Sequence, residues 1–189
     1  LALLLCLVLL VTALALPVSA DNAAAWDGSI DTSWYSKGET EFEISTPAQL
    51  AGLAAIVSGE ATGISTDSFK GKTVKLTADL DLGGVKAANG TWSGPCWKPI
   101  GKNYGNAFSG TFLGGGHKIS NLYFEKSLSK LTQNIGLFAN IGTGGYVEGI
   151  NLVSGYLHNE NANTYLAGIA GINAGTIVSC HNGADVYGE

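Results

Sequence analysis

Apolar and polar residues alternate over residues 71–82, and this is the clearest periodic stretch of the chain. A period of two residues is typical of a strand that buries one face. Residues 71–82 are therefore predicted to form a strand, and residues 41–44 a shorter one by the same alternation. The buried face of the longer strand would carry Val74, Leu76, Ala78, Leu80 and Leu82.

One stretch has helical periodicity. Thr46 and Pro47 are residue types favoured at the N-cap and at the first helical position, and Gly59 marks the end of the pattern. Apolar residues lie between them at helical spacing, which predicts a helix over residues 46–58. The first layer of a stack of strands exposes an open edge and an apolar end. We therefore interpret this helix as an N-terminal cap.

The last third of the chain repeats one pattern three times. Each copy begins with glycine and small apolar residues, passes through a Gly- or Asn-rich turn and ends in a short alternating segment. The apolar residues Ile119, Val147 and Ile177 are 28 and 30 residues apart, within the ~20–50 residue period of solenoids and arrays. One copy buries too little apolar area to fold alone. The copies are thus expected to stack, with these three residues in register.

Residues 1–20 form an apolar run that ends in small residues, Val18-Ser19-Ala20. This pattern indicates a secretory signal peptide and predicts a chain that is secreted or displayed at the cell surface, without membrane contact after cleavage. The missing Met and basic residues indicate a truncated start. An uncleaved membrane anchor is the alternative, because the run is barely long enough to cross a bilayer.

These signals divide the chain into three parts. Residues 1–20 are the signal peptide, residues 21–45 form an N-terminal lead with the first strand, and residues 46–189 contain the helix and the stacked copies. Residues 85–104 and 123–134 are predicted to be loops between strands. The last residues begin another copy without a polar cap, so we expect the natural chain to continue into downstream domains.

Composition narrows the choice of partners. The chain has 27 glycines, no methionine, 13% charged residues and a net charge of −5, which suits turns and strands. All ten basic residues are lysines, so the planar bidentate contacts of arginine are absent and nucleic acid is disfavoured as a partner.

Two cysteines remain after cleavage of the signal peptide, Cys96 and Cys180. Cys180 occupies an apolar-face position of its copy, which favours two separately buried thiols. A disulfide between the two is the alternative, because export permits it and sequence does not fix connectivity. Neither cysteine has a second Cys or His at ligand spacing, so no metal or other cofactor is predicted.

Several motifs occur in a fixed order along nearly all of the mature chain: TPAQLAGLA, FKGKTVKLTADLDLGG, WKPIG, FSGTFLGGGHKISNL, GLFANI and GIAGINAGTIVSCHNGADVYG. In this order they resemble the Glug-repeat surface proteins of bacteria, which are adhesin-like exported chains. The same repeat occurs beside immunoglobulin-A-cleaving metallopeptidases. The resemblance implies an all-β fold, a right-handed parallel β-helix, within a longer surface protein.

No catalytic motif accompanies this resemblance. The chain has no His-Glu-x-x-His helix for zinc and no nucleophile elbow, so we predict that it is not an enzyme. Asp79 and Asp81 would lie about 7 Å apart on one strand face, a spacing that suits a glycosidase pair or part of a calcium site. The favoured interpretation is structural, with solvated carboxylates or bonds to turn amides. His117 has no acid nearby in sequence and is typical of a turn residue.

The aromatic residues of the predicted loops allow two interpretations. Trp92 and Trp97 could form a stacking platform for sugar rings, with Asp79 and Asp81 beside them, because apolar ring faces meet sugar C–H groups. Burial at the end of the stack is the favoured alternative.

Three functions follow from these patterns. The leading hypothesis is a non-enzymatic surface module, adhesin-like, that contacts a host, matrix or cell-surface glycan or protein. The second is a carbohydrate-binding or carbohydrate-processing domain, and the third is a spacer that holds another domain away from the cell envelope.

Overall fold

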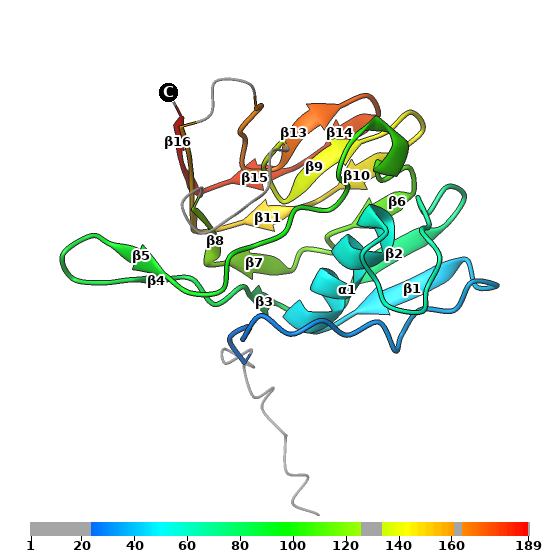
Figure 1. Ribbon diagram of the computed structural model, residues 1–189, viewed down its shortest axis with the longest axis horizontal. Coiled ribbons are helices and arrows are strands. Elements are labelled where there is room, and N and C mark those ends of the chain that lie inside the picture. Colours follow the sequence, from blue (N-terminus) through cyan, green and yellow to red (C-terminus); the bar gives the residue numbers. More distant parts are fainter. Residues whose placement is uncertain (1–23, 126–133, 161–163, 189) are drawn as a thin grey trace, which may run out of the picture.

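The computed structural model describes residues 24–125, 134–160 and 164–188. Short strands predominate, and one α-helix lies among the first of them. Within each of the three larger sheets the strands follow chain order, with colours that run toward red in Figure 1. The predicted signal peptide lies outside the described residues. The 126–133 part of the second predicted loop also lies outside them.

The largest sheet has five parallel strands in the order β1, β2, β6, β10 and β14. Their bounds are Glu41–Ile44, Thr73–Leu76, Thr111–Leu113, Tyr146–Glu148 and Thr176–Val178. One register position carries an apolar residue in every strand, and these residues form the hydrophobic column: Phe42, Val74, Phe112, Val147 and Ile177. The first four are buried, so this column is a continuous part of the core.

Consecutive strands along the chain enter different sheets. The second parallel sheet contains β3 (Leu80–Asp81), β7 (Lys118–Ser120), β11 (Asn151–Leu152) and β15 (His181–Asn182). The third contains β8 (Leu122–Glu125), β12 (Gly155–Asn159) and β16 (Asp185–Gly188), and β9 (Phe138–Ile141) pairs with β13 (Ala170–Asn173). All of these pairs are parallel.

Ile119 does not lie in register with the two residues that the repeat assigned to it. Val147 pairs with Ile177 and with Phe112, whereas Ile119 pairs with Leu152 in the second sheet. Each copy has buried apolar positions in more than one sheet, and spacing alone does not say which of them correspond. The prediction was right for Val147 and Ile177 and wrong for Ile119.

Residues 71–82, predicted as one strand, contain a corner. β2 ends at Leu76 in the largest sheet, and β3 begins at Leu80 in the second. At the corner, the backbone N–H of Thr77 donates to the carbonyl oxygen of Ile44 at 2.9 Å. Leu76 and Leu80 are both buried. The alternation of apolar and polar residues in the sequence continues across the corner and does not reveal it.

The predicted helix is present as α1, which spans Pro47–Ser58. The Thr46 side chain accepts a hydrogen bond from the backbone N–H of Gln49, and the Gln49 side chain accepts one from the backbone N–H of Thr46. These two bonds form a capping box, of which only the Thr46 N-cap was predicted. A Cβ at Gly52 would lie 2.0 Å from the carbonyl oxygen of Asp31. Glycine therefore lets the N-terminal lead pack directly on α1.

The apolar side chains of α1 belong to the same core as the hydrophobic column. Figure 1 shows α1 beside β1 and β2, at the blue and cyan end of the molecule. Its buried residues are Pro47, Leu50, Ala51, Gly52, Leu53, Ala54, Ala55, Ile56 and Val57. Burial on this scale explains why a twelve-residue helix is stable here, because short helices depend on packing more than on propensity.

Residues 85–104, predicted as a long loop, contain a β-hairpin. Its antiparallel strands are β4 (Val85–Lys86) and β5 (Trp92–Ser93), and Figure 1 shows the hairpin projecting beyond the other strands. The loop prediction for residues 123–134 also fails at its start, because β8 extends to Glu125. Both errors concern strand segments too short to show a period. A 3-10 turn, η1 (Tyr104–Asn106), follows the hairpin.

Candidate functional site

A groove lies where the β4–β5 hairpin meets the outer face of the third sheet. It has a volume of about 550 Å³, within the ~300–1,000 Å³ of ligand sites. We call it the aromatic groove, and it is lined by Asn89, Gly90, Thr91, Trp92, Tyr123, Glu125 and Tyr156. Residues distant in sequence are thus brought together by the hairpin and by the pairing of β8 with β12.

Three aromatic rings of the groove are nearly parallel. The Trp92 and Tyr156 ring centroids are 6.0 Å apart with an angle of 18° between the planes, and the Tyr123 and Tyr156 centroids are 6.3 Å apart at 25°. Strand geometry explains the second contact, because Tyr123 and Tyr156 are register partners on one sheet face. Their neighbours Phe124 and Leu157 point into the core.

Charged and polar groups border these rings. The Nδ1 atom of His158 lies 2.9 Å from Glu125 Oε1, and its Nε2 atom lies 3.6 Å from Glu160 Oε1. On the hairpin side, Lys86 Nζ lies 3.8 Å from Asp185 Oδ2 and 5.9 Å from the Trp92 ring centroid. Among the described residues, carboxylates therefore predominate beside the groove.

The tyrosines of the groove are hydrogen-bond donors at neutral pH. Burial raises the pKa of both Tyr123 and Tyr156, and the charge of Glu125 raises both further. The phenols consequently stay protonated well above neutrality. Tyr123 is buried, whereas Trp92 and Tyr156 are half-buried and present ring surface.

Trp92 and Trp97, predicted together as a sugar platform, separate in the structure. Trp92 lines the groove, but Trp97 is 1% exposed and its Nε1 atom donates to the Leu137 carbonyl oxygen at 3.2 Å. Its ring packs edge-on against Trp26, with centroids 5.6 Å apart. Trp97 is therefore a core residue and has no surface for a sugar. Its burial agrees with the alternative that was favoured from the sequence.

Asp79 and Asp81 do not line the aromatic groove. Asp79 Oδ1 accepts the backbone N–H of Lys118 at 2.9 Å and lies 3.2 Å from His117 Nδ1. The Lys118 N–H lowers the pKa of Asp79. His117 thus has an acid beside it, Asp79, which is 38 residues away in the chain. The residues next to His117 in the sequence did not indicate this contact.

Asp81 has a similar structural arrangement. Its Oδ1 atom accepts the backbone N–H of Gly83 and the side-chain amide of Asn121, both at 2.9 Å. Each of the two carboxylates thus accepts a hydrogen bond from residues in or just after β7, about 40 residues further along the chain. Among the described residues, no group of three or more His, Cys, Asp or Glu side chains is arranged to hold a metal ion.

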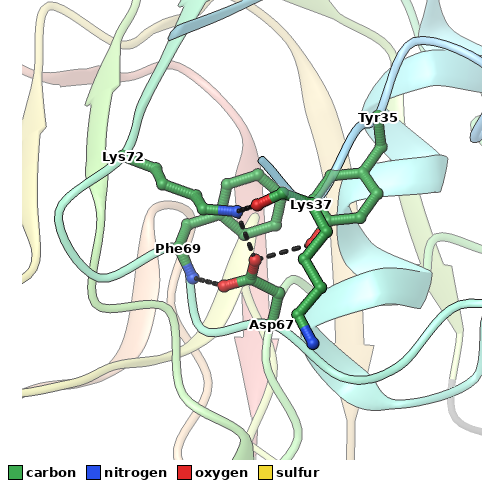
Figure 2. Close-up of polar contacts among 5 residues, drawn as sticks. All are labelled: Tyr35, Lys37, Asp67, Phe69 and Lys72. Atoms are coloured by element: carbon green, nitrogen blue, oxygen red, sulfur yellow. Dashed lines mark hydrogen bonds and ion pairs between the residues drawn. The ribbon is translucent and has the colours of Figure 1, made fainter. Parts of the chain in front are cut away.

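A second polar cluster ties the N-terminal lead to the loop before β2 (Figure 2). Asp67 accepts hydrogen bonds from the Tyr35 hydroxyl, the Phe69 backbone N–H and Lys72 Nζ, each at 2.7 Å. Lys72 Nζ also donates to the Lys37 carbonyl oxygen at 3.0 Å. The cluster therefore joins the N-terminal lead to the loop before β2 through one carboxylate and one ammonium group.

Aromatic rings surround this ammonium group. Lys72 Nζ lies 5.1, 5.6 and 5.8 Å from the ring centroids of Tyr35, Phe42 and Phe69, within the range of cation–π attraction. With its cation occupied by Asp67 and three rings, the cluster is structural. It positions the lead against the first strands.

Stability should fall in alkali because of this cluster. Burial, reinforced by the Asp67 hydrogen bond and charge, raises the pKa of Tyr35 from 10.0 to about 12. The folded protein binds the phenol proton more tightly than the unfolded chain, so this stabilisation is complete below pH 10.0 and is lost as pH rises through about 12. Partial exposure screens the effect, so we expect about 1–2 kcal/mol. Urea unfolding at several alkaline pH values would measure it.

The control for this prediction is Tyr35→Phe, which should flatten the alkaline loss, beside Tyr104→Phe, which should not. Tyr104 is 79% exposed. Identical pH profiles for the protein and Tyr35→Phe would contradict the assignment.

The pKa of the Asp67 carboxyl shifts in the opposite direction to that of Tyr35. Burial raises this pKa, but hydrogen bonds from Lys72 and Tyr35 outweigh burial and lower it. Its contribution is present above the unfolded pKa and is lost as acid protonates the folded form.

Cys96 and Cys180 are both free and half-buried, so they do not form a disulfide in this structure. Burial raises the pKa of Cys96 and disfavours its reactive thiolate. Cys96 borders a second cavity, of about 370 Å³, between the N-terminal lead, α1 and residues 95–98. This cavity lies beside the buried Trp26 and Trp97 rings.

Comparison with known proteins gives one relative. No protein-family model matches the chain, and no solved structure matches it. A protein of Evansella cellulosilytica named "Putative Gly-rich membrane protein" is 34% identical over 104 residues. The match covers 55% of this chain and 10% of that protein.

In the part of the chain that the structure describes, no helix is both long and apolar enough to cross a membrane.

Proposed function

We propose that this chain is a non-enzymatic module of an exported bacterial surface protein. In this proposal its strands wind as a right-handed parallel β-helix, and α1 covers the first layer. The observation that carries the proposal is the hydrophobic column from Phe42 to Ile177, which continues through five parallel strands. A stack of this kind is stiff and quasi-one-dimensional, which suits presentation of a surface away from the cell.

The sheet order supports the winding. Strand numbers change in chain order along each of the three larger sheets. The last three passages of the chain, β6 to β8, β10 to β12 and β14 to β16, each add one strand to each of these sheets. The position of α1 supports its role as a cap, because its buried face joins the core beside β1, the edge strand of the largest sheet. A covered first layer would prevent that end of the stack from pairing with other chains.

Export and surface location draw support from sequence. The apolar run of residues 1–20 has the composition of a signal peptide, and the name of the Evansella relative describes a Gly-rich membrane protein. That relative is much longer than the matched stretch, which fits a module within a larger chain. An adhesin-like contact or a spacer role would both use such a module.

A tagged chain tests the surface location. An epitope inserted after Gly90, at the exposed turn of the β4–β5 hairpin, should be labelled by antibody on intact cells of the native host. Deletion of residues 1–20 should abolish that labelling while leaving the tag detectable after lysis. A cytoplasmic marker protein controls for leakage. Labelling that appears only in lysed cells would refute export.

The absence of catalysis is tested separately. The purified chain, incubated with polysaccharides, should release no reducing sugar above a boiled control. Release that Asp79→Asn or Asp81→Asn abolished would overturn the non-enzymatic part of the proposal.

A further inference from the structure

We propose that the aromatic groove binds a neutral, hydroxyl-rich oligosaccharide across the outer face of β8 and β12. This assigns a ligand class to the groove and goes beyond the surface-module proposal, because it does not depend on export or on the winding of the strands. Trp92 and Tyr156 would supply the stacking surface, and Tyr123 the floor.

The rings provide the apolar part of sugar recognition. A pyranose has one or two faces of C–H groups, and these pack on flat aromatic surface. Trp92 and Tyr156 are nearly parallel at 18° and are both half-buried, so they present ring surface at a fixed orientation. An aromatic pair in the core would instead be closed to solvent, as Trp26 and Trp97 are.

The polar lining suits hydroxyl groups. The Tyr156 phenol can both donate and accept, the Asn89 amide can donate, and the Glu125 carboxylate accepts. The Thr91 hydroxyl donates to Asn89 Oδ1 at 2.7 Å, so toward a ligand it acts as an acceptor. A sugar hydroxyl also donates and accepts, so it can satisfy each of these groups in turn. An apolar ligand would remove water from these groups without offering them hydrogen bonds, which disfavours its binding.

The charges beside the groove select against anions. Glu125, Glu160 and Asp185 are carboxylates, and Lys86, which lies close to the Trp92 ring, lies 3.8 Å from Asp185. Within the part of the chain that the structure describes, the carboxylates beside the groove would repel a phosphate, sulfate or uronic acid. The Glu125 carboxylate already faces His158 at 2.9 Å, so the groove does not require a cationic ligand either.

The groove is preformed. The hairpin is fixed to the sheet by the Trp92–Tyr156 stack and the Lys86–Asp185 pair. At its base, a Cβ on Gly84 would lie 2.6 Å from the Asn121 carbonyl oxygen, so the glycine lets the hairpin strand meet the sheet closely. A rigid wall loses little entropy on binding, which favours a shallow site for a weakly bound sugar.

Glycan binding by the full chain tests this inference. The probes are tetrasaccharides of β-linked glucose, mannose and N-acetylglucosamine, with a tetrasaccharide of galacturonic acid and one of glucosamine for comparison. Isothermal titration should show binding of at least one neutral probe with Kd below about 1 mM. Quenching of tryptophan fluorescence should follow the same curve. The galacturonate probe should not bind.

Matched variants locate the site. Trp92→Ala and Tyr156→Ala should each weaken binding of that probe about tenfold or more, whereas Trp92→Phe should keep most of it. Tyr104→Ala, at an exposed position outside the groove lining, should leave affinity unchanged. Circular dichroism and thermal unfolding check that every variant is folded.

Three results would overturn the inference. One is no binding of any neutral probe up to about 10 mM. Another is binding that survives both Trp92→Ala and Tyr156→Ala. The third is binding of the glucosamine or galacturonate probe alone, which would indicate recognition by charge. None of these outcomes bears on surface location, so a failure here leaves the surface-module proposal standing.

Discussion

Replacing Trp97 with alanine is expected to lower the free energy of unfolding by about 3–5 kcal/mol. The side chain is 1% exposed, and its ring packs against Trp26. Its removal would leave a cavity that the surrounding strands fill only in part, and it would leave the Leu137 carbonyl oxygen without the indole N–H. Urea unfolding followed by far-ultraviolet circular dichroism measures the loss.

Trp92→Ala is the matched control, because it removes the same side chain from a half-buried position on the hairpin. It should cost less than about 1.5 kcal/mol, mainly the stacking on Tyr156. Equal losses for the two variants would show that Trp97 is not the core residue described above. A larger loss at Trp92 would contradict its assignment to the groove wall.

Val147→Asp is expected to unfold the protein or to destabilise it by more than about 4 kcal/mol. Val147 is fully buried in the hydrophobic column, between Phe112 on one side and Ile177 on the other. A carboxylate at that position would be desolvated without a cation to pair with it. Thermal unfolding, or loss of the cooperative transition, is the measurement.

Ile177→Asp is the control for this substitution. Ile177 occupies the same column, but in the edge strand β14, where it is only half-buried. The new carboxylate could reach water there, so the loss should be much smaller. If both variants were equally destabilised, the burial of the column would not decrease toward β14 as described. Val147→Ile, which keeps the apolar character but adds one methylene group, should cost about 1–3 kcal/mol, less than Val147→Asp.

Local signals predicted the first elements of the fold well. The predicted strand at residues 41–44 and the predicted helix after Thr46 agree with the structure. Their signals are alternation, an N-cap followed by proline, and a terminal glycine, and each of these depends only on residues that are neighbours in the sequence. The corner between β2 and β3 escaped prediction because it does not interrupt alternation. Ile119 was misassigned because register depends on which strands pair, and repeat spacing does not determine that.

The candidate site was only partly predictable for the same reason. Trp92 was identified because tryptophan in a loop is conspicuous. Tyr123 and Tyr156 were missed, although each alternates with a buried neighbour in its strand. Their proximity depends on the pairing of β8 with β12 and on a hairpin placed over both. A search for aromatic residues on the polar face of paired repeats would have found them.

The two aspartates show how sequence spacing can suggest a site that the favoured structural interpretation did not require. Asp79 and Asp81 are close in sequence and resemble a catalytic pair, but each is occupied by a different partner, Lys118 with His117 for one and Asn121 for the other. Those partners are about 40 residues away. Short spacing between acids is therefore weak evidence for a site in a chain whose contacts join neighbouring repeats.

The arrangement of strand pairs also has a mechanical consequence. β14, β15 and β16 each pair with one strand among the described residues, namely β10, β11 and β12. The hydrogen bonds of parallel strands point along the direction in which strands are added to a sheet. Tension applied in that direction would load one strand pair at a time, so β14, β15 and β16 would detach before the strands they pair with, at low force. Tension along the strands would instead shear all the hydrogen bonds of a strand pair together.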